Sequence, residues 1–373
     1  MWNIYKIMLV SFLSCSQFQL WGQSLIDTEA TPETRILYRN LHDLAGKQVL
    51  FGQQDATNYG HSWSVGENRS DVKDVCGSHP AIIGDDFNRV TVLDKGRSEK
   101  GKEHLLKVIK ETYSRGGLTT ICWHCANPVN GGSFYFEKNP VEAVSKILPD
   151  SSNHQQYVEY LNRIAEVAHA AKGSSGELIP ILFRPFHEFD GDWFWWGKAH
   201  CSKENFIALW RFTIDYLKNT KQVHNLVYVF SPDCKFQTEE EYLERYPGDE
   251  YVDILGMDNY WDFRPDGANN PDLALLKLKV VSDVAKKKHK LAALTETGLE
   301  GVTNYQWYTS VLLPILKNPS LKLSYVMVWR NANYDPNHYY APYPGHPSEK
   351  DFKDFKNDSF VCFEDSLPEM YKE

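Results

Sequence analysis

The chain has 373 residues, of which 42% are hydrophobic and 24% charged, so it can bury a substantial core. Its formal net charge is −9. This balance argues against a nucleic-acid partner and gives no electrostatic reason to bind an anionic membrane.

The first 22 residues differ in composition from the rest of the chain. Lys6 is their only charged residue, and an apolar run at residues 7–13 follows it. The run is too short to span a bilayer and is typical of a signal peptide. We therefore interpret residues 1–22 as a signal peptide and expect a periplasmic or secreted protein. Cys15 gives an alternative, a lipoprotein anchored to the membrane through this cysteine. Residues 23–373 are interpreted as a single domain.

Eight short apolar runs follow one another along the chain, and each ends in polar or aromatic residues. They cover residues 49–51, 81–83, 119–121, 179–183, 226–230, 253–256, 291–294 and 325–328. Continuous apolar character predicts strands that are buried on both faces, as in a parallel sheet.

Several segments between these runs repeat apolar residues at helical spacing, which predicts helices over residues 155–171, 204–217, 273–288 and 307–316. Pro314 predicts a break or kink in the last of them. Eight strands alternating with helices predict an α/β fold of the (β/α)8 barrel type. An open doubly wound sheet is the alternative, and the lack of a Gly-rich loop after the first strand disfavours it.

Six cysteines follow the first 22 residues, and two of them flank a Trp-His pair: Cys122 and Cys125. Cysteines three apart on a strand point to opposite faces, and no second pair with metal-ligand spacing follows. We therefore expect ordinary packing or a disulfide, and neither a metal nor a cofactor.

The polar residues that end the predicted strands would meet at one rim of a barrel, where barrel enzymes place their chemistry. Glu188 follows the fourth strand and Glu296 the seventh, so the two can face each other across the mouth. Glycoside hydrolysis requires such a pair of carboxyl groups, and the aromatic content of 14% suits a groove whose rings stack on sugars. The alternative is that these glutamates only form ion pairs with Arg184 or Arg330.

Several motifs resemble glycoside hydrolase family 26, in order, over essentially the whole chain after residue 22. The stretch RPFHEFDGDWFWWG at residues 184–197 resembles the family's acid/base motif, and LTETG at residues 294–298 resembles its nucleophile motif. Further matches are FGQQ at 51–54, WH at 123–124, DILGMDNYW at 253–261 and VWRN at 328–331.

The resemblance implies a role for each matching residue. Glu188 is expected to act as acid/base and Glu296 as nucleophile, with Tyr260 bonded to the nucleophile. The other implied substrate-binding residues are His124, His187, Trp193, Trp329 and Arg330. Trp195 and Trp196 are expected to pack the loop rather than touch sugar, and Asp190 and Asp192 to form a turn.

The resemblance further implies a retaining endo-β-1,4-mannanase that acts on mannan, galactomannan, glucomannan and manno-oligosaccharides. Release of mannobiose from chain ends is the first alternative, and cleavage of a mixed-linkage β-glucan a weaker one. The charged stretch at residues 86–102 could either wall off the groove or leave it open. A barrel that only binds polysaccharide is disfavoured because neither carboxylate is missing. The oligomeric state stays open.

Overall fold

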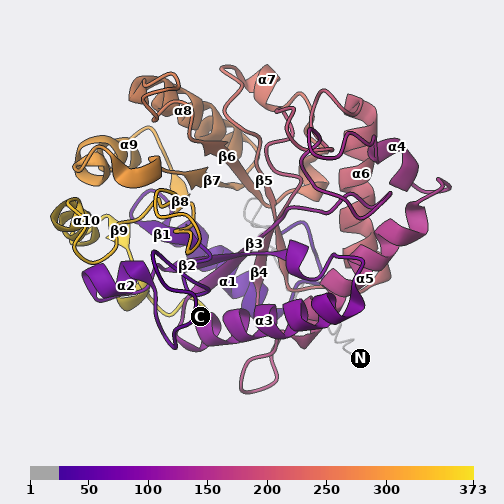
Figure 1. Ribbon diagram of the computed structural model, residues 1–373, viewed down its shortest axis with the longest axis horizontal. Coiled ribbons are helices and arrows are strands. Elements are labelled where there is room, and N and C mark those ends of the chain that lie inside the picture. The colour runs from indigo at the N-terminus through magenta and orange to yellow at the C-terminus, as the bar shows by residue number, and fades with distance from the viewer. Residues whose placement is uncertain (1–24) are drawn as a thin grey trace, which may run out of the picture.

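The structure, a computed structural model, describes residues 25–373. The predicted signal peptide and Cys15 lie outside the described residues. Eight parallel strands form a ring that pairing between β1 and β2 closes (Figure 1). The strands are β1 (Val49–Gln54), β2 (Ile82–Asp86), β3 (Leu118–Trp123), β4 (Ile181–Pro185), β5 (Leu226–Phe230), β6 (Ile254–Asn259), β7 (Leu291–Thr297) and β8 (Leu323–Val328). The predicted (β/α)8 barrel is confirmed, and an open sheet is excluded.

Helices surround the ring, as Figure 1 shows. They are α1 (Pro32–Leu44), α2 (Asp71–Cys76), α3 (Lys95–Ser114), α4 (Val144–Ile147), α5 (His154–Ala170), α6 (Lys203–Asp215), α7 (Glu239–Tyr242), α8 (Pro271–Lys287), α9 (Leu313–Leu316) and α10 (Glu349–Lys356). Three of the predicted helices correspond to α5, α6 and α8. The fourth, at residues 307–316, is a π-helical turn over Tyr308–Leu312 followed by α9, with Pro314 in the first turn of α9.

The strands are buried on both faces, as their continuous apolar runs predicted. In β5, Val227 and Val229 pack in the core inside the ring, whereas Leu226, Tyr228 and Phe230 pack in the core between the strands and the helices. The alternation follows from the two-residue period of a strand. Apolar strand residues therefore pack in cores on both faces of the strands, and polar residues collect at and beyond the carboxyl ends.

Helix α1 closes the amino-terminal end of the ring. Its residues Leu37, Tyr38 and Leu41 belong to the same core as the residues inside the barrel. The Tyr38 hydroxyl donates a 2.9 Å hydrogen bond to the carbonyl of Asp253, just before β6 begins. Because one end is filled in this way, the carboxyl ends of the strands form the accessible mouth of the barrel.

The sequence did not predict the short strand that follows β8, and it left open whether the cysteines form disulfides. A short strand, β9 (Val361–Cys362), pairs in parallel with Val49 and Leu50 at the start of β1. The six cysteines of the described chain are free thiols, so they pack without a disulfide.

Among residues 25–373, no helix has the length and apolar character needed to cross a membrane.

Candidate active site

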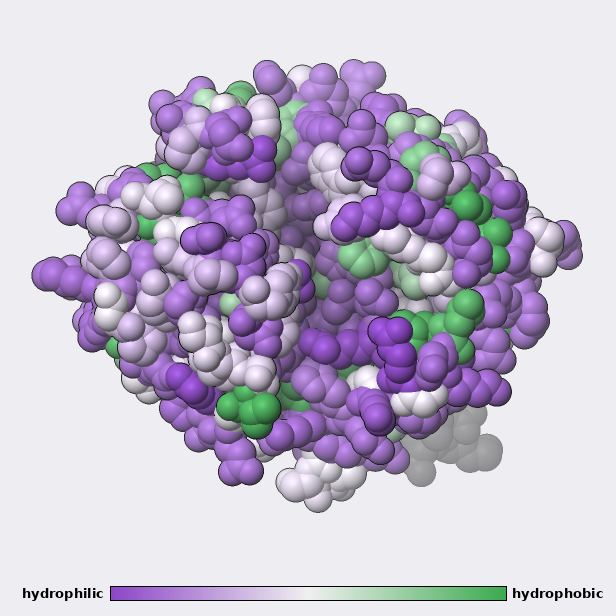
Figure 2. Space-filling view, in the orientation of Figure 1, coloured by the Kyte–Doolittle hydropathy of each residue, from purple (hydrophilic) through white to green (hydrophobic). Residues whose placement is uncertain are grey.

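Figure 2 shows a hollow at the centre of the face viewed in Figure 1, lined largely by hydrophilic residues. The polar endings of the strands meet there. Glu296 lies in β7, and Glu188 lies in the turn just after β4, which ends at Pro185. The two predicted glutamates therefore share one rim.

A local irregularity of β7 places Glu296. Met257 pairs with Leu294, but the next residue of β6, Asp258, pairs with Glu296, so Thr295 is an extra residue in β7. Bulges of this kind re-aim a side chain and recur beside active sites. The Thr295 hydroxyl donates a 2.7 Å hydrogen bond to Asp258, which fixes the bulge to its neighbour.

The Glu296 carboxylate is buried and accepts two hydrogen bonds. The Tyr260 hydroxyl donates to Oε2 at 2.9 Å, and the Arg184 guanidinium donates to Oε1. The same guanidinium donates to Asp258 at 2.7 Å. Burial opposes the charge of Arg184, but Asp258 and Glu296 outweigh it and raise the pKa of Arg184 well above its usual value. Glu296 is thus held by a permanent cation and a hydroxyl, with the expected Tyr260 contact present.

Glu188 is positioned by an unusual backbone. Phe186 and Glu188 both have left-handed conformations, with φ of 48° and 55°. Residues other than glycine adopt this conformation rarely and at an energetic cost. The Glu188 amide donates a 2.9 Å hydrogen bond to the carbonyl of Ser231 after β5, which ties the turn to the neighbouring strand end.

The surroundings of the Glu188 carboxyl group differ from those of Glu296. Its one hydrogen bond to a side chain comes from Trp193 Nε1, at 2.7 Å, and no Lys or Arg of residues 25–373 forms an ion pair with it. Burial, Asp258, Glu296 and Asp233 raise the pKa of Glu188 well above its usual value, and the Trp193 bond opposes this. An ion pair with Arg184 therefore forms at Glu296, and none forms at Glu188 within the described residues.

His124 and His187 lie against each other beside these carboxyl groups. Their Nε2 atoms are 3.2 Å apart and their ring planes are nearly perpendicular, at 81°. The His124 ring also approaches Trp329, with ring centroids 5.9 Å apart. The structure thus brings three of the predicted sugar-binding residues together.

Trp329 and Arg330 follow β8. The Arg330 guanidinium lies over the rings of Trp329 and Tyr334 and donates a 2.8 Å hydrogen bond to the Tyr334 hydroxyl. It also lies near Tyr59, whose hydroxyl accepts at 3.4 Å. All eight predicted site residues are therefore at the same end of the barrel.

Several hollows open at this rim, and two of them flank the candidate site. One, of about 1030 Å³, contains Glu188, Trp193, Tyr260 and the half-exposed Trp261. The other, of about 520 Å³, contains Arg330 and part of the charged stretch at residues 86–102. That stretch is not a long loop: it comprises a 3-10 turn (Phe87–Arg89) and the beginning of α3.

Comparison with known proteins places the chain in a family. The sequence model described as "Glycosyl hydrolase family 26" matches residues 26–362. The chain belongs to glycosyl hydrolase family 26. The family resemblance found in the sequence is thereby confirmed.

Family 26 relatives cover the chain at moderate identity. A mannan endo-1,4-β-mannosidase of Bifidobacterium adolescentis is 34% identical over 92% of this chain and 36% of its own length. A mannan endo-1,4-β-mannosidase of Bacillus subtilis is 28% identical over 51% of this chain and 53% of its own length. The chain therefore spans about a third to a half of these curated relatives.

Solved structures of the family match the barrel over nearly its whole length. A family 26 β-mannanase from Bacteroides ovatus is 41% identical, with a TM-score of 0.84, and the match covers 92% of this chain and 98% of that one. A family 26 structure from Muricauda sp. MAR_2010_75 is 39% identical, with a TM-score of 0.88, covering 93% and 96%.

Within this family 26 barrel, most aromatic residues of the loop after β4 pack in the core. Trp195 and Trp196 are fully buried and pack the loop, as the sequence predicted. Phe186 and Phe189 pack in the outer core, against residues such as Phe206. Asp190 accepts hydrogen bonds from the amides of Asp233 and Lys235, so it holds the β5 loop.

Sequence reasoning missed the groups that surround the two carboxyl groups. Arg184 was considered only as a rival partner for the glutamates, and Asp86 and Asp258 were given no role. Their position directly at the ends of β2, β4 and β6 was the available signal. Their partners lie on other strands, and only the folded barrel shows them.

Within residues 25–373, two groups of residues have side chains close enough to hold a cation: Asp86, Cys122 and His124, and His187, Asp258 and Glu296. In the first, Asp86 already bonds His124 at 2.7 Å, and burial raises the pKa of the Cys122 thiol well above its usual value, which disfavours the thiolate ligand. In the second, the Arg184 guanidinium already bonds both carboxylates. Hydrogen bonds and a fixed cation satisfy both groups, so neither fits a metal site well.

Proposed function

We propose that this protein is a retaining endo-β-1,4-mannosidase that cleaves mannan, galactomannan, glucomannan and manno-oligosaccharides. The observation that carries the proposal is the pair of carboxyl groups in unlike surroundings at one rim. Glu188 has a raised pKa and no cationic partner among residues 25–373, whereas Glu296 accepts from Arg184 and Tyr260. When the surroundings of two carboxyl groups differ in this way, one group suits the role of acid and the other the role of nucleophile.

In the first step, the Glu188 carboxyl group gives its proton to the glycosidic oxygen while a Glu296 oxygen attacks the anomeric carbon. The C–O bond breaks, the leaving sugar departs with the proton, and an ester joins the remaining sugar to Glu296. In the second step, Glu188 takes a proton from water, and the water oxygen displaces Glu296 from the anomeric carbon.

The two steps require opposite protonation states of Glu188, and the arrangement supports the change. The negative charge of Glu296 is one cause of the raised pKa of Glu188. Forming the ester removes that charge, so the pKa of Glu188 falls and the group becomes a better base. The carboxyl group is thus an acid before the ester forms and a base afterwards.

Mannan as the substrate rests on the family 26 relatives named mannan endo-1,4-β-mannosidase and on the cleft. Trp193, Tyr260, Trp261 and Trp329 offer rings that suit the apolar faces of sugars, and Arg330 offers donors for hydroxyls. Sugar choice depends on the fine shape of such a pocket.

The test of the mechanism is Glu296→Ala with an aryl β-mannobioside. We expect hydrolysis to be abolished, and added azide to yield the glycosyl azide of inverted configuration, because azide then attacks from the side that Glu296 vacates. Glu188→Ala serves as a matched control: with azide it should instead give a product of retained configuration. Near-normal turnover by Glu296→Ala would remove this residue from the nucleophile role.

Release of mannobiose from chain ends is the second candidate. The turn η1 (Phe87–Arg89) and α3 line the hollow that contains Arg330, and a groove walled off there would bind only the end of a mannan chain. The space of about 520 Å³ there supports binding of further sugars and hence internal cleavage. A time course on mannohexaose and galactomannan separates the two modes. A ladder of products with falling viscosity supports internal cleavage, and mannobiose alone at early times supports end-on release.

A further inference from the structure

We propose that Asp86 fixes the tautomers of His124 and His187, so that His124 carries its proton on Nδ1 and His187 carries its proton on Nε2. Asp86 lies at the end of β2 and contacts neither glutamate through any hydrogen bond of the described chain. It would be a positioning residue that acts through two histidines. Its effect on catalysis rests on the proposed function, but the tautomer assignment does not.

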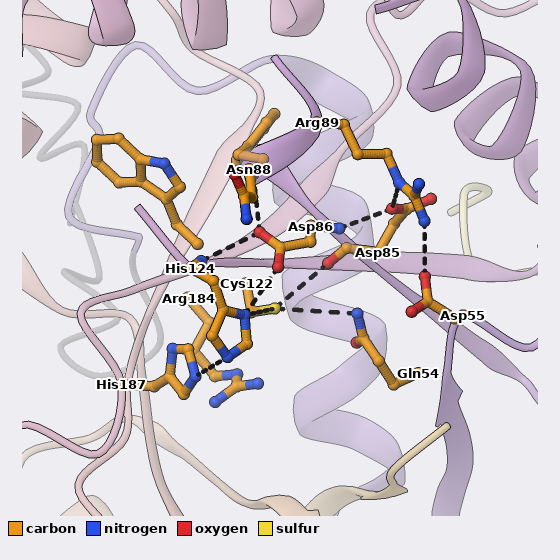
Figure 3. Close-up of polar contacts among 12 residues, drawn as sticks. Gln54, Asp55, Asp85, Asp86, Asn88, Arg89, Cys122, His124, Arg184 and His187 are labelled. Carbon is orange, nitrogen blue, oxygen red and sulfur yellow. Dashed lines mark hydrogen bonds and ion pairs between the residues drawn. The ribbon is translucent and has the colours of Figure 1, made fainter. Parts of the chain in front are cut away.

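The first step is the orientation of the Asp86 carboxylate. Its Oδ1 accepts hydrogen bonds from the backbone amides of Asn88, at 2.8 Å, and His124, at 3.1 Å. These two backbone donors fix which oxygen faces the imidazole. Oδ2 then lies 2.7 Å from His124 Nδ1. Figure 3 marks this contact with a dashed line. Since a carboxylate can only accept, Nδ1 of His124 must carry the proton.

The second step follows from the partners of His187. Burial, Arg184 and His124 hold the pKa of His187 well below its usual value, so this ring carries one proton. Nδ1 of His187 forms no hydrogen bond with the described residues, and a buried N–H without an acceptor is costly, so the proton belongs on Nε2. Nε2 of His187 lies 3.2 Å from Nε2 of His124, which must therefore accept and carry no proton. Figure 3 marks this contact.

The remaining neighbour of His124 does not supply a competing proton. Cys122 Sγ lies 3.7 Å from His124 Nδ1, but its single S–H can point to the carbonyl of Asp85, at 3.5 Å. The chain of hydrogen bonds from Asp86 through His124 to His187 thus has one direction. It ends close to Glu296, because a ring nitrogen of His187 lies within 4.8 Å of oxygens of both Glu296 and Asp258.

Asp86→Asn reverses this chain. The two backbone amides would keep the Asn oxygen in the Oδ1 position, so the amide NH2 would face His124 Nδ1 and donate to it. His124 would then carry its proton on Nε2, and His187 would accept through Nε2 and hold its proton on Nδ1. Two imidazole dipoles beside Glu296 would reverse while the shape of the site stayed nearly the same. We expect kcat/KM to fall about 10- to 100-fold, mainly in kcat, as when other groups that orient a histidine are replaced.

The experiment is 15N NMR of histidine-labelled wild type and Asp86→Asn, without substrate, together with steady-state kinetics. We expect protonated Nδ1 of His124 and protonated Nε2 of His187 in the wild type, and the opposite pair in the variant. Asp55→Asn is the matched control, because it removes a carboxylate from the same hollow and contacts no histidine. It should leave both tautomers unchanged.

If the variant fails to fold, the wild-type spectrum alone tests the tautomers assigned to His124 and His187. A wild-type His124 protonated on Nε2 would overturn the proposal, and so would an Asp86→Asn variant with unchanged tautomers or with kcat within threefold of wild type. Failure of the proposed function looks different: the tautomers would be as stated, but neither protein would hydrolyse mannan.

Discussion

Glu188 and Trp193 share a hydrogen bond that bears directly on the pH range of the proposed reaction. The Trp193 indole N–H donates to the Glu188 carboxylate at 2.7 Å and so stabilises its charged form. The other influences, burial and the charges of Asp258, Glu296 and Asp233, raise the pKa of Glu188. The first catalytic step needs the protonated form, so activity should fall as the pH rises through this pKa.

Trp193→Phe removes the only one of these groups that lowers the pKa of Glu188. The pKa should therefore rise, and the basic limb of the profile of kcat/KM against pH should move to higher pH by about one unit. Absolute activity should also fall, because the ring lines the cleft. The position of the limb is the measurement, and a limb that stays in place or moves to lower pH would contradict the prediction.

The loop after β4 shows how one element holds Glu188, the proposed acid/base, in place. Its backbone is left-handed at Phe186 and Glu188, and two buried tryptophans anchor it. The Trp196 indole donates a 2.8 Å hydrogen bond to the carbonyl of His187, and the Trp195 indole donates at 2.8 Å to the carbonyl of Cys125. Packing and hydrogen bonds thus stabilise a turn that the backbone alone would not favour.

Trp196→Phe keeps an aromatic ring but leaves the buried carbonyl of His187 without its donor. We expect the free energy of unfolding to fall by about 2–3 kcal/mol, from the lost hydrogen bond and the reduced volume. Urea unfolding measures this loss. Trp261→Phe is the matched control, because Trp261 is 49% exposed and the change should stay within about 0.5 kcal/mol. Equal stabilities for the two variants would show that Trp196 does not anchor the loop.

At the scale of the whole molecule, His79 links the segment after β1 to the end of the chain. Its Nε2 lies 2.9 Å from Asn68 Oδ1 and its Nδ1 2.8 Å from the Ser70 hydroxyl, while its carbonyl accepts from the amide of Glu364 at 3.1 Å. A neutral ring satisfies both side-chain contacts. Burial, Arg115 and Lys73 lower the pKa of His79 to about 3.

His79 should therefore make the folded protein sensitive to acid. An unfolded histidine has a pKa of about 6.5, so between pH 6.5 and 3 the unfolded chain binds a proton that the folded chain does not. The contribution to stability is complete above pH 6.5 and is lost as the pH falls toward 3. Between pH 7 and 4, wild type should lose roughly 2–3 kcal/mol more than His79→Gln in chemical unfolding. Parallel losses in the two proteins would contradict this.

Much of the fold could be predicted from the sequence because barrel strands are local and buried on both faces. The runs at residues 226–230 and 325–328 became β5 and β8, and the helical periodicity at residues 155–171 became α5 within one residue at each end. Helix α1, which closes the barrel, and β9 were not predicted. A two-residue strand carries too little periodicity to be recognised.

The sequence by itself determined that Glu188 and Glu296 stand at strand ends, and hence that they meet at one rim, because all strands of a parallel barrel end at the same face. Only the tertiary structure decided their surroundings. Arg184 bonds Asp258 and Glu296 because β4, β6 and β7 converge and a bulge in β7 turns the carboxylate inward. The chain of hydrogen bonds from Asp86 to His187 likewise joins three strand ends. These contacts depend on register and on small irregularities that residue types along the chain do not encode.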